Sequence, residues 1–286
     1  MSRSTWTGAD NNADWADPDN WSPAGVPGAG SDVVISTGAP VASASIGTVN
    51  SIMDSAELSF ESAGTNTVTT FLDNTGFLYV DHSAGEGGTT LNIGTLTNSH
   101  RIWIGNPTLS APDEVTAASL DNTGGIGLNG SSADQSLLDV TGAAGFGTAG
   151  TLTGNVLLGQ NGLNDDSAIE FLSGQISTIA ASSELTLSGS SAFIEDSTAL
   201  GSNSALTDLT DIAGSLTLVN GASVSTTGAL TNSGFLGLDN NYAQGGSTLS
   251  IGGALTNTGT LDIGNFVLQG SIPLRRNPSS TAGRSI

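Results

Sequence analysis

Two short segments with alternating aliphatic residues carry the side chains best suited to bind a ligand. Residues 77–80 read Phe-Leu-Tyr-Val and residues 101–104 read Arg-Ile-Trp-Ile. Successive side chains of a β-strand point to opposite faces, so aliphatic residues that face a core leave the other four side chains facing outward. Those four are Phe77, Tyr79, Arg101 and Trp103. Exposed aromatic rings beside a cation could form a platform for a sugar ring or for a partner protein.

A purely structural role is the alternative interpretation of these four side chains. Aromatic residues on adjacent strands stabilise a sheet by packing against each other. A loop such as residues 81–89 could also fold over them and cover the wall. Both interpretations place the four side chains together on one outer surface, and the sequence leaves the choice between them open.

The chain offers few groups for catalysis, and we predict that it is not an enzyme, has no catalytic residues and uses no cofactor. It has no cysteine, and His82 and His100 lie in turn-like positions with no Ser or Asp arrangement that the sequence links to them. A lyase acting on an acidic polysaccharide would need several basic residues, and only Arg101 is available. A hydrolase that pairs carboxylates across neighbouring strands stays open, because spacing along the chain does not reveal such pairs.

Aspartates gather near the N-terminus and raise the possibility of a calcium site. Carboxylates and loop carbonyls bind Ca²⁺, but this segment lacks both the EF-hand loop and the glycine-rich nonapeptide of calcium-bound β-rolls. We therefore predict no metal site and expect solvated turn residues. The aspartates concerned are Asp10, Asp14, Asp17 and Asp19.

A repeated block positions the candidate side chains. It reads apolar, polar, Asn, polar, Gly and then apolar, polar, apolar, as in Leu-Thr-Asn-Thr-Gly-Thr-Leu-Asp-Ile over residues 255–263. Blocks begin at Leu72, Leu96 and Leu120, and again at Leu230 and Leu255. Their spacing of about 24 to 25 residues lies within the range of about 20 to 50 that indicates a solenoid, a propeller or an array. Short strands separated by Asn and Gly turns fit one coil of a β-helix, in which each coil pairs only with its neighbours.

The Asn and Gly of each block predict the geometry of a corner. Equivalent asparagines would lie about 4.8 Å apart on successive coils, where each side-chain amide could donate to a carbonyl of the next coil. Two residues later stands a glycine, with His100 as the exception, and we expect φ > 0 there, a region that His tolerates better than most residues. His100 is then a corner residue rather than a catalyst. The asparagines are Asn74, Asn98, Asn122, Asn232 and Asn257, and the glycines are Gly76, Gly124, Gly234 and Gly259.

These patterns predict an all-β fold, a single-stranded β-helix (β-solenoid) with coils of about 24 residues and an aromatic N-terminal cap. Residues 1–31 hold Trp6, Trp15 and Trp21 and are expected to cover the open end of the first coil. Residues 32–270 form the solenoid, with its first strand at 32–36 and longer loops where the repeat loosens between 131 and 228. Residues 271–286 lose the periodicity and the acidic balance, which predicts a disordered tail or a linker.

The charge balance excludes several partner classes. Of 286 residues, 26 are acidic and 5 are basic, giving a net charge of −21. So few cations cannot neutralise nucleic-acid phosphates, and anionic membrane surfaces would repel the chain. We therefore predict no nucleic-acid partner and, since no run approaches about 18 apolar residues, no membrane insertion. The absence of cysteine suits a protein that is exported unfolded, because no wrong disulfide can form during export. We also expect this sequence to be a part of a longer protein.

The N-terminal motifs resemble a known group of proteins. Residues 4–36 contain Trp-Thr-Gly, Asp-Trp, Asn-Trp and then Gly-Val-Pro-Gly-Ala-Gly-Ser-Asp-Val-Val-Ile. This order resembles the opening of β-helical surface proteins of Gram-negative bacteria, the autotransporter-passenger and haemagglutinin-like adhesin group. The resemblance implies an extracellular or cell-surface segment of a bacterial protein that serves adhesion or acts as a stalk, with a host-cell or matrix glycan or protein as partner.

Two other functions stay open at this point. One is a carbohydrate-active β-helix enzyme, either a polysaccharide hydrolase or a lyase. The other is a filament subunit that self-associates by end-to-end stacking, because a last coil near residues 261–263 would expose a strand edge.

Overall fold

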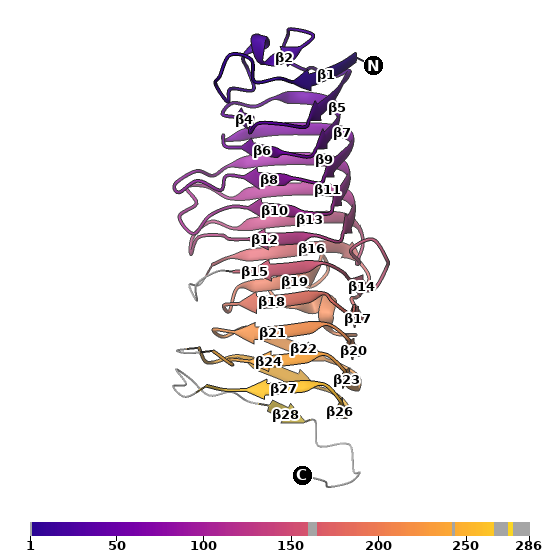
Figure 1. The fold of residues 1–286 in the computed structure, drawn as a ribbon. Coiled ribbons are helices and arrows are strands. Elements are labelled where there is room, and N and C mark those ends of the chain that lie inside the picture. Colours follow the sequence, from indigo (N-terminus) through magenta and orange to yellow (C-terminus); the bar gives the residue numbers. More distant parts are fainter. Residues whose placement is uncertain (1, 160–164, 242–243, 266–273, 277–286) are drawn as a thin grey trace.

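In the computed structural model the chain is all-β, and its strands form long parallel sheets stacked along one axis (Figure 1). The structure describes residues 2–159, 165–241, 244–265 and 274–276. Their helical segments are two single 3-10 turns, η1 (Pro18–Asn20) and η2 (Ser204–Leu206), so no described helix has the length and apolar character needed to cross a membrane.

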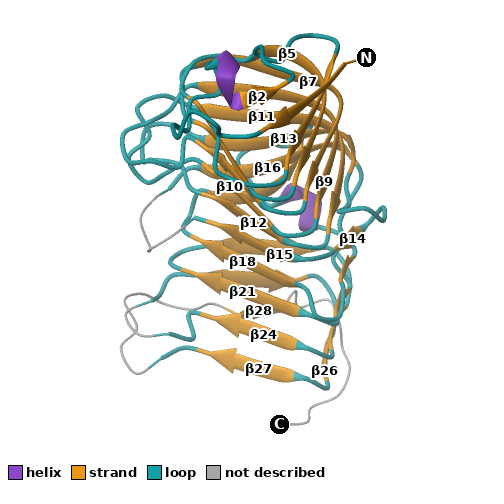
Figure 2. Ribbon diagram, turned by 45° about the horizontal axis from the view of Figure 1, so that its top comes forward, coloured by secondary structure: helices purple, strands orange, loops and turns teal. Residues whose placement is uncertain are grey.

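Two ten-stranded sheets form the main walls (Figure 2). Sheet A contains β1 (Ser2–Trp6), β2 (Trp21–Ser22), β3 (Ser31–Ile35), β5 (Gly47–Asp54), β7 (Gly64–Asn74), β9 (Thr89–Asn98), β11 (Asp113–Asn122), β13 (Ser136–Ala143), β16 (Ser167–Ser173) and β19 (Ala192–Asp196). Sheet B contains β4 (Val41–Ala42), β6 (Glu57–Phe60), β8 (Phe77–Val80), β10 (Arg101–Ile104), β12 (Gly125–Leu128), β15 (Asn155–Leu158), β18 (Glu184–Ser188), β21 (Ser215–Val219), β24 (Phe235–Leu238) and β27 (Thr260–Ile263).

Two smaller sheets continue the walls toward the C-terminal end. Sheet C contains β14 (Thr151–Leu152), β17 (Thr178–Ile179), β20 (Asp211–Ile212), β23 (Leu230–Asn232) and β26 (Leu255–Asn257). Sheet D contains β22 (Ser223–Thr226), β25 (Thr248–Ile251) and β28 (Leu274–Arg276). Of the tail predicted at 271–286, only β28 belongs to the described residues, and it pairs in parallel with β25. The rest of that prediction lies outside the described residues.

Each turn of the chain through sheets A and B, here called a coil, pairs in register with the coil before it and the coil after it. Arg101 pairs with Phe77 on one side and with Gly125 on the other, so these two steps along the chain are equal and match the spacing of the blocks. The step from Glu184 to Ser215 is longer, and the step from Ser215 to Phe235 is shorter. The walls therefore stay in register while the loops between them change length, as the loosened repeat predicted.

The core is a column of aliphatic side chains between the sheets. In sheet B the inward positions Leu78, Val80, Ile102 and Ile104 are fully buried, which confirms their predicted direction. Burying one such side chain contributes about 1.5–3 kcal/mol, and the same alternation repeats on the coils that follow. Their outward neighbours must therefore form the surface of the molecule.

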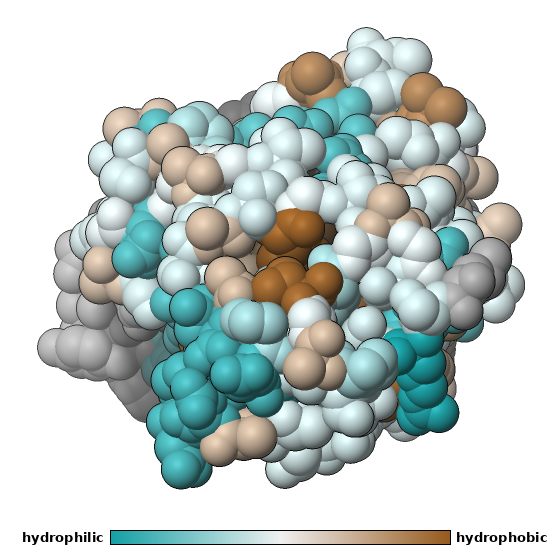
Figure 3. All heavy atoms as spheres, turned by 90° about the horizontal axis from the view of Figure 1, so that it is seen from above, coloured by the Kyte–Doolittle hydropathy of each residue, from teal (hydrophilic) through white to brown (hydrophobic). Residues whose placement is uncertain are grey.

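The N-terminal end is closed by a tryptophan cluster. Trp6 and Trp15 both pack edge-to-face against Trp21, with ring centroids 5.1 and 4.7 Å apart. The indole Nε1 of Trp21 donates to the carbonyl of Trp15 at 2.8 Å. The strand predicted at 32–36 is β3, and β1 adds one earlier parallel strand to the same sheet before the short antiparallel β2 ends it. Seen from this end, mostly hydrophilic and near-neutral atoms surround a small hydrophobic hollow (Figure 3).

The asparagine corner is confirmed. The Nδ2 of Asn74 donates to Oδ1 of Asn98 at 2.7 Å, and Asn98 donates in the same way to Asn122 at 2.6 Å. Farther along, Asn232 donates to Asn257 at 2.6 Å. The same amides also reach main-chain carbonyls of the next coil, such as Asn74 to Arg101 at 2.8 Å. Asn74, Asn98 and Asn232 therefore each donate two hydrogen bonds to the next coil, one to a side chain and one to the backbone.

The expected positive φ at the corner glycines is wrong. Neither these glycines nor His100 has a positive φ. At the four glycines the backbone of the preceding coil leaves no room for a Cβ, whereas His100 carries one at the same corner. A Cβ on Gly76 would stand 2.2 Å from the carbonyl oxygen of Ala56, and one on Gly124 would stand 2.4 Å from that of His100. Close stacking of the coils, and not the turn conformation, selects glycine at those four positions.

Candidate functional site

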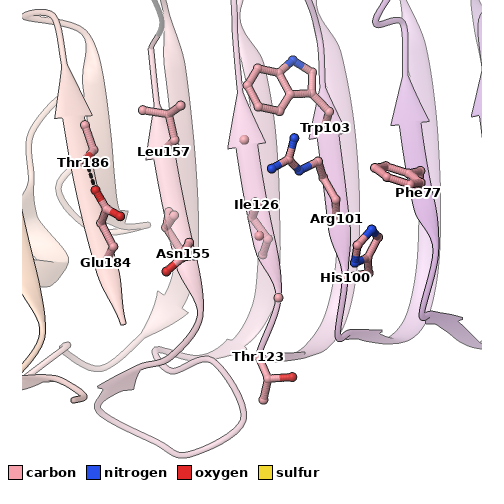
Figure 4. Close-up of a pocket in the computed structure, with 14 residues that line it drawn as sticks. Phe77, His100, Arg101, Trp103, Thr123, Ile126, Asn155, Leu157, Glu184 and Thr186 are labelled. Atoms are coloured by element: carbon pink, nitrogen blue, oxygen red, sulfur yellow. Dashed lines mark hydrogen bonds between the residues drawn. The ribbon is translucent and has the colours of Figure 1, made fainter. Parts of the chain in front are cut away.

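A groove of about 570 Å³ crosses the outer face of sheet B, over β8, β10, β12, β15 and β18 (Figure 4). One wall carries Phe77, His100, Arg101 and Trp103, and the other carries Asn155, Leu157, Glu184 and Thr186. Gly125 and Gly127 form the floor between them. Regular strands therefore hold every wall residue except His100, which directly precedes β10.

The register of sheet B explains why the surface is hollow here. Arg101, Gly125, Asn155 and Glu184 are successive partners in one outward row, and Trp103, Gly127, Leu157 and Thr186 follow one another in the next. Both outward positions of β12 are glycine, so this strand adds no side chains to the surface. At about 4.8 Å per strand, Arg101 and Glu184 lie about 14 Å apart along the axis. The groove is long enough for more than one sugar ring.

Gly127 determines where the Trp103 ring lies. A Cβ on Gly127 would stand 2.4 Å from the indole Cε3 and Cζ3 atoms, so the ring occupies the space above this residue. Gly127 is buried although it faces outward, whereas Trp103 remains half-buried. The indole thus extends from β10 across β12, where the sequence supplies no competing side chain.

The aromatic rings of this wall also pack on each other. Phe77 and Tyr79 stack with centroids 6.0 Å apart, and His100 meets Phe77 edge-on at 4.6 Å. His82 stacks on Tyr79 at 4.8 Å and meets Trp103 edge-on at 5.8 Å. Burial lowers the pKa of His82, while the carboxylates of Glu61 and Glu57 oppose that shift. Tyr79 thus packs against Phe77 and His82 outside the groove, while Phe77, Arg101 and Trp103 line it.

The sequence did not predict the opposite wall, and it indicated only a corner role for His100, which also lines the groove. A signal for the floor was present, because residues 125–128 read Gly-Ile-Gly-Leu and place glycine at both outward positions. Residues 155–158 and 184–187 alternate as strands do, but the step from Gly125 to Asn155 is longer than the repeat, so the sequence did not place Asn155 or Glu184 opposite Arg101. His82 lies in the loop that was expected to cover the aromatic residues, and it contacts two of them.

Arg101 is the only basic residue between Arg3 and Arg275. It is exposed, and among the described residues its guanidinium has no hydrogen-bond acceptor and no carboxylate within ion-pair distance. Figure 4 shows this side chain beside Trp103, directed toward β12. On the other wall the Glu184 carboxylate accepts a hydrogen bond from Oγ1 of Thr186 at 3.2 Å. The groove thus has one cationic end and one anionic end.

The outer face of sheet A brings acidic residues together across coils. Asp139, Glu170 and Glu195 are successive partners in register. Burial raises the pKa of Glu170, and the Asp139 carboxylate adds to that shift. Oε2 of Glu195 accepts a hydrogen bond from the backbone of Gly201 at 2.7 Å, so the following loop covers this residue. Asp139 and Glu170 remain as neighbouring carboxylates, and the hydrolase alternative stays a prediction.

The N-terminal aspartates have turn roles. Asp14 and Asp17 each accept a hydrogen bond from the backbone two residues ahead, at 2.9 and 3.0 Å, and Asn12 donates to Asp17 at 2.8 Å. Within the described ranges no cluster of three or more His, Cys, Asp or Glu residues is arranged to hold a metal ion. End-to-end stacking also stays a prediction: β27 is the last strand of sheet B, with Leu261 and Ile263 exposed.

Comparisons with known proteins do not add to this description. No protein-family model matches the chain, and searches of curated proteins and of solved structures found no match. The function must be inferred from the site. The groove is the strongest feature for that purpose, because it combines open aromatic surface, a cation and hydrogen-bonding groups on a rigid wall.

Proposed function

We propose that this chain is a non-enzymatic, extracellular segment of a bacterial surface protein that serves adhesion by binding glycans in the groove of sheet B. Its scaffold is a single-stranded β-helix whose basic coil has about 24 residues. The observation that supports this function most directly is the half-buried Trp103 indole beside the open space over Gly125, with polar side chains on the far wall.

The chemistry of the walls suits a sugar. Aromatic rings pack against the apolar faces of amphipathic ligands, while a few placed polar groups fix their orientation. Trp103 and Phe77 supply the rings, and Asn155, Glu184 and Thr186 supply donors and acceptors for hydroxyl groups. All five belong to hydrogen-bonded strands, so little conformational entropy is lost when a ligand binds.

The size of the groove favours an oligosaccharide over a protein partner. Small-ligand sites have volumes of about 300–1,000 Å³, whereas stable protein interfaces bury about 1,200–2,000 Å² of surface. The groove, at about 570 Å³, falls in the first class. A protein partner would have to spread over the outer faces beyond the groove.

Replacing Trp103 by Ala tests the proposal. We expect the native chain to bind members of a glycan array and W103A to bind them roughly tenfold more weakly or worse, as for a buried aromatic anchor. The measurement is an array screen followed by titration calorimetry on the glycans that bind.

Phe235 provides a matched control. It faces outward on β24 in the row of Arg101, and its ring covers Gly237, the residue of the Trp103 row on that strand, but it lies outside the groove. F235A should therefore keep native affinity, and circular dichroism should show both variants folded. Equal losses in the two variants, or no glycan bound by the native chain, would contradict the proposal.

A further inference from the structure

Arg101 forms no ion pair among the described residues, although the molecule has many carboxylates. The chain has 26 acidic residues, yet no described carboxylate lies within ion-pair distance of this guanidinium. Guanidinium groups present several donors in a planar fork, and they pair with carboxylates wherever geometry allows. An exposed arginine left unpaired in a chain of net charge −21 is therefore available for an external anion.

The space over Gly125 is open, and it lies beside the Arg101 guanidinium. A Cβ built on Gly125 would have no atom closer than 3.7 Å, and Nε of Arg101 would be 4.0 Å away. A small ligand group lying over Gly125 would thus be within reach of the guanidinium. The same ligand could contact the Trp103 indole, which covers the adjacent Gly127. Cation, floor and ring form one subsite.

The other end of the groove selects against a second negative charge. Glu184 lies three strands from Arg101, about 14 Å along the axis, and it is exposed. Its carboxylate can accept hydrogen bonds from sugar hydroxyls but would repel an acidic ring. The net charge of −21 repels polyanions as a whole.

We infer that the ligand is an oligosaccharide that carries a single carboxylate, bound by Arg101 over Gly125 while a neutral ring lies toward Glu184. This inference rests on the proposed function and specifies its ligand class. The carboxylate acts as the specificity group, and stacking on Trp103 supplies binding that a neutral analogue shares.

Three ligands with one common backbone test the inference. The first ends in a uronic acid, the second has that carboxyl reduced to an alcohol, and the third carries a carboxylate on every ring. We expect the whole chain to bind the first roughly tenfold more tightly than the second, which is the scale of a charge-assisted hydrogen bond. The third should bind more weakly than the first.

Variants of Arg101, Glu184 and Trp103 separate the effects of the cation, the carboxylate and the aromatic ring on ligand affinity. R101Q should bind the acid and the alcohol with similar affinity, and E184Q should strengthen binding of the fully acidic ligand. W103A should weaken all three. If the native chain binds acid and alcohol equally through Trp103, the inference is wrong and the proposed function stands. If it binds none of these ligands and no array glycan, both fail.

Discussion

Asp113 and Asp81 meet in a buried corner although they belong to different coils. Oδ1 of Asp113 accepts from the backbone of Gly88 at 2.9 Å, and Oδ2 of Asp81 accepts from Thr89 at 3.0 Å. The second oxygen of each is buried without a partner. Burial, with the adjacent Asp81 carboxylate, raises the pKa of Asp113 to about 9. One proton between the two carboxylates satisfies both, so Asp113 is protonated at neutral pH.

This proton makes stability depend on pH. The pKa of Asp113 is about 9 in the folded chain and about 3.9 in the unfolded chain, so the folded state binds the extra proton between these values. Its contribution to the free energy of unfolding is complete below about pH 4 and is lost as the pH rises to about 9. We expect D113N to reduce the loss of stability between pH 5 and pH 9 in urea titrations.

Asp73 is the matched control for that experiment. It lies on the outer face of sheet A, where it is half-buried, so D73N controls for the removal of one negative charge away from the Asp113 and Asp81 pair. A native chain equally stable at pH 5 and pH 9, or a D113N variant with an unchanged pH dependence, would contradict the shared proton.

At the scale of an element, each asparagine ladder starts with an unsatisfied amide. Oδ1 of Asn74 and Oδ1 of Asn232 are buried without partners. The residues before them in register are Asp54 and Ile212, and neither an ionised carboxylate nor an aliphatic side chain donates a hydrogen bond. Burial raises the pKa of Asp54 to about 7, and its Oδ2 has no partner either. The first ladder therefore stops one rung short.

Replacing Asp54 by Asn should extend that ladder. The new Nδ2 can donate to Oδ1 of Asn74, and its Oδ1 can still accept from the backbone of Ala56, as Asp54 does at 3.0 Å. We expect D54N to stabilise the chain by about 1 kcal/mol at pH 8. The gain should shrink at pH 5, where Asp54 is protonated and can itself donate. Thermal unfolding at both pH values measures this.

The control for the ladder is D54A, which removes the charge but offers no donor. It should gain less than D54N at pH 8, because Asn74 stays unsatisfied. If D54A and D54N are equally stable, relief of the buried charge is the whole effect. The ladder then contributes nothing at this position.

At the scale of the whole molecule, self-repulsion is the main electrostatic effect. The net charge of −21 arises from 26 acidic residues against 5 basic ones. The coils are stacked along one axis and each contacts only its neighbours, so repulsion acts between surfaces that share few compensating cations. Stability at low ionic strength should therefore be lower than packing alone would give.

Added salt should stabilise the chain. Between about 0.01 M and 0.1 M NaCl the screening length falls from about 30 to 10 Å, which weakens repulsion between carboxylates on different coils. We expect Tm to rise by at least about 2–4 °C, the equivalent of roughly 1 kcal/mol at this size. KCl should act like NaCl. An unchanged or falling Tm would contradict net repulsion, and a rise with only one of these salts would indicate specific ion binding.

The sequence by itself determined the strands, their sidedness and the repeating corners. Period-2 alternation requires one face of each strand to be apolar, so it alone directs Leu78 and Ile102 inward and Phe77, Arg101 and Trp103 outward. The equal spacing of the first blocks also places Phe77 beside Arg101, and Asn74 beneath Asn98. Local pattern suffices for such features because neighbouring coils repeat it.

Only the tertiary structure decided which residues of different coils meet where the number of residues per coil changes or where neighbouring backbones stack closely. The groove needs Asn155 and Glu184 opposite Arg101, and the longer steps that lead to these two residues carry no periodic signal. At Gly76 and Gly124 the neighbouring coil would lie within 2.4 Å of a Cβ, a contact that no single coil contains. Register across an insertion is fixed by hydrogen bonds between strands, so it exists only once the coils have assembled.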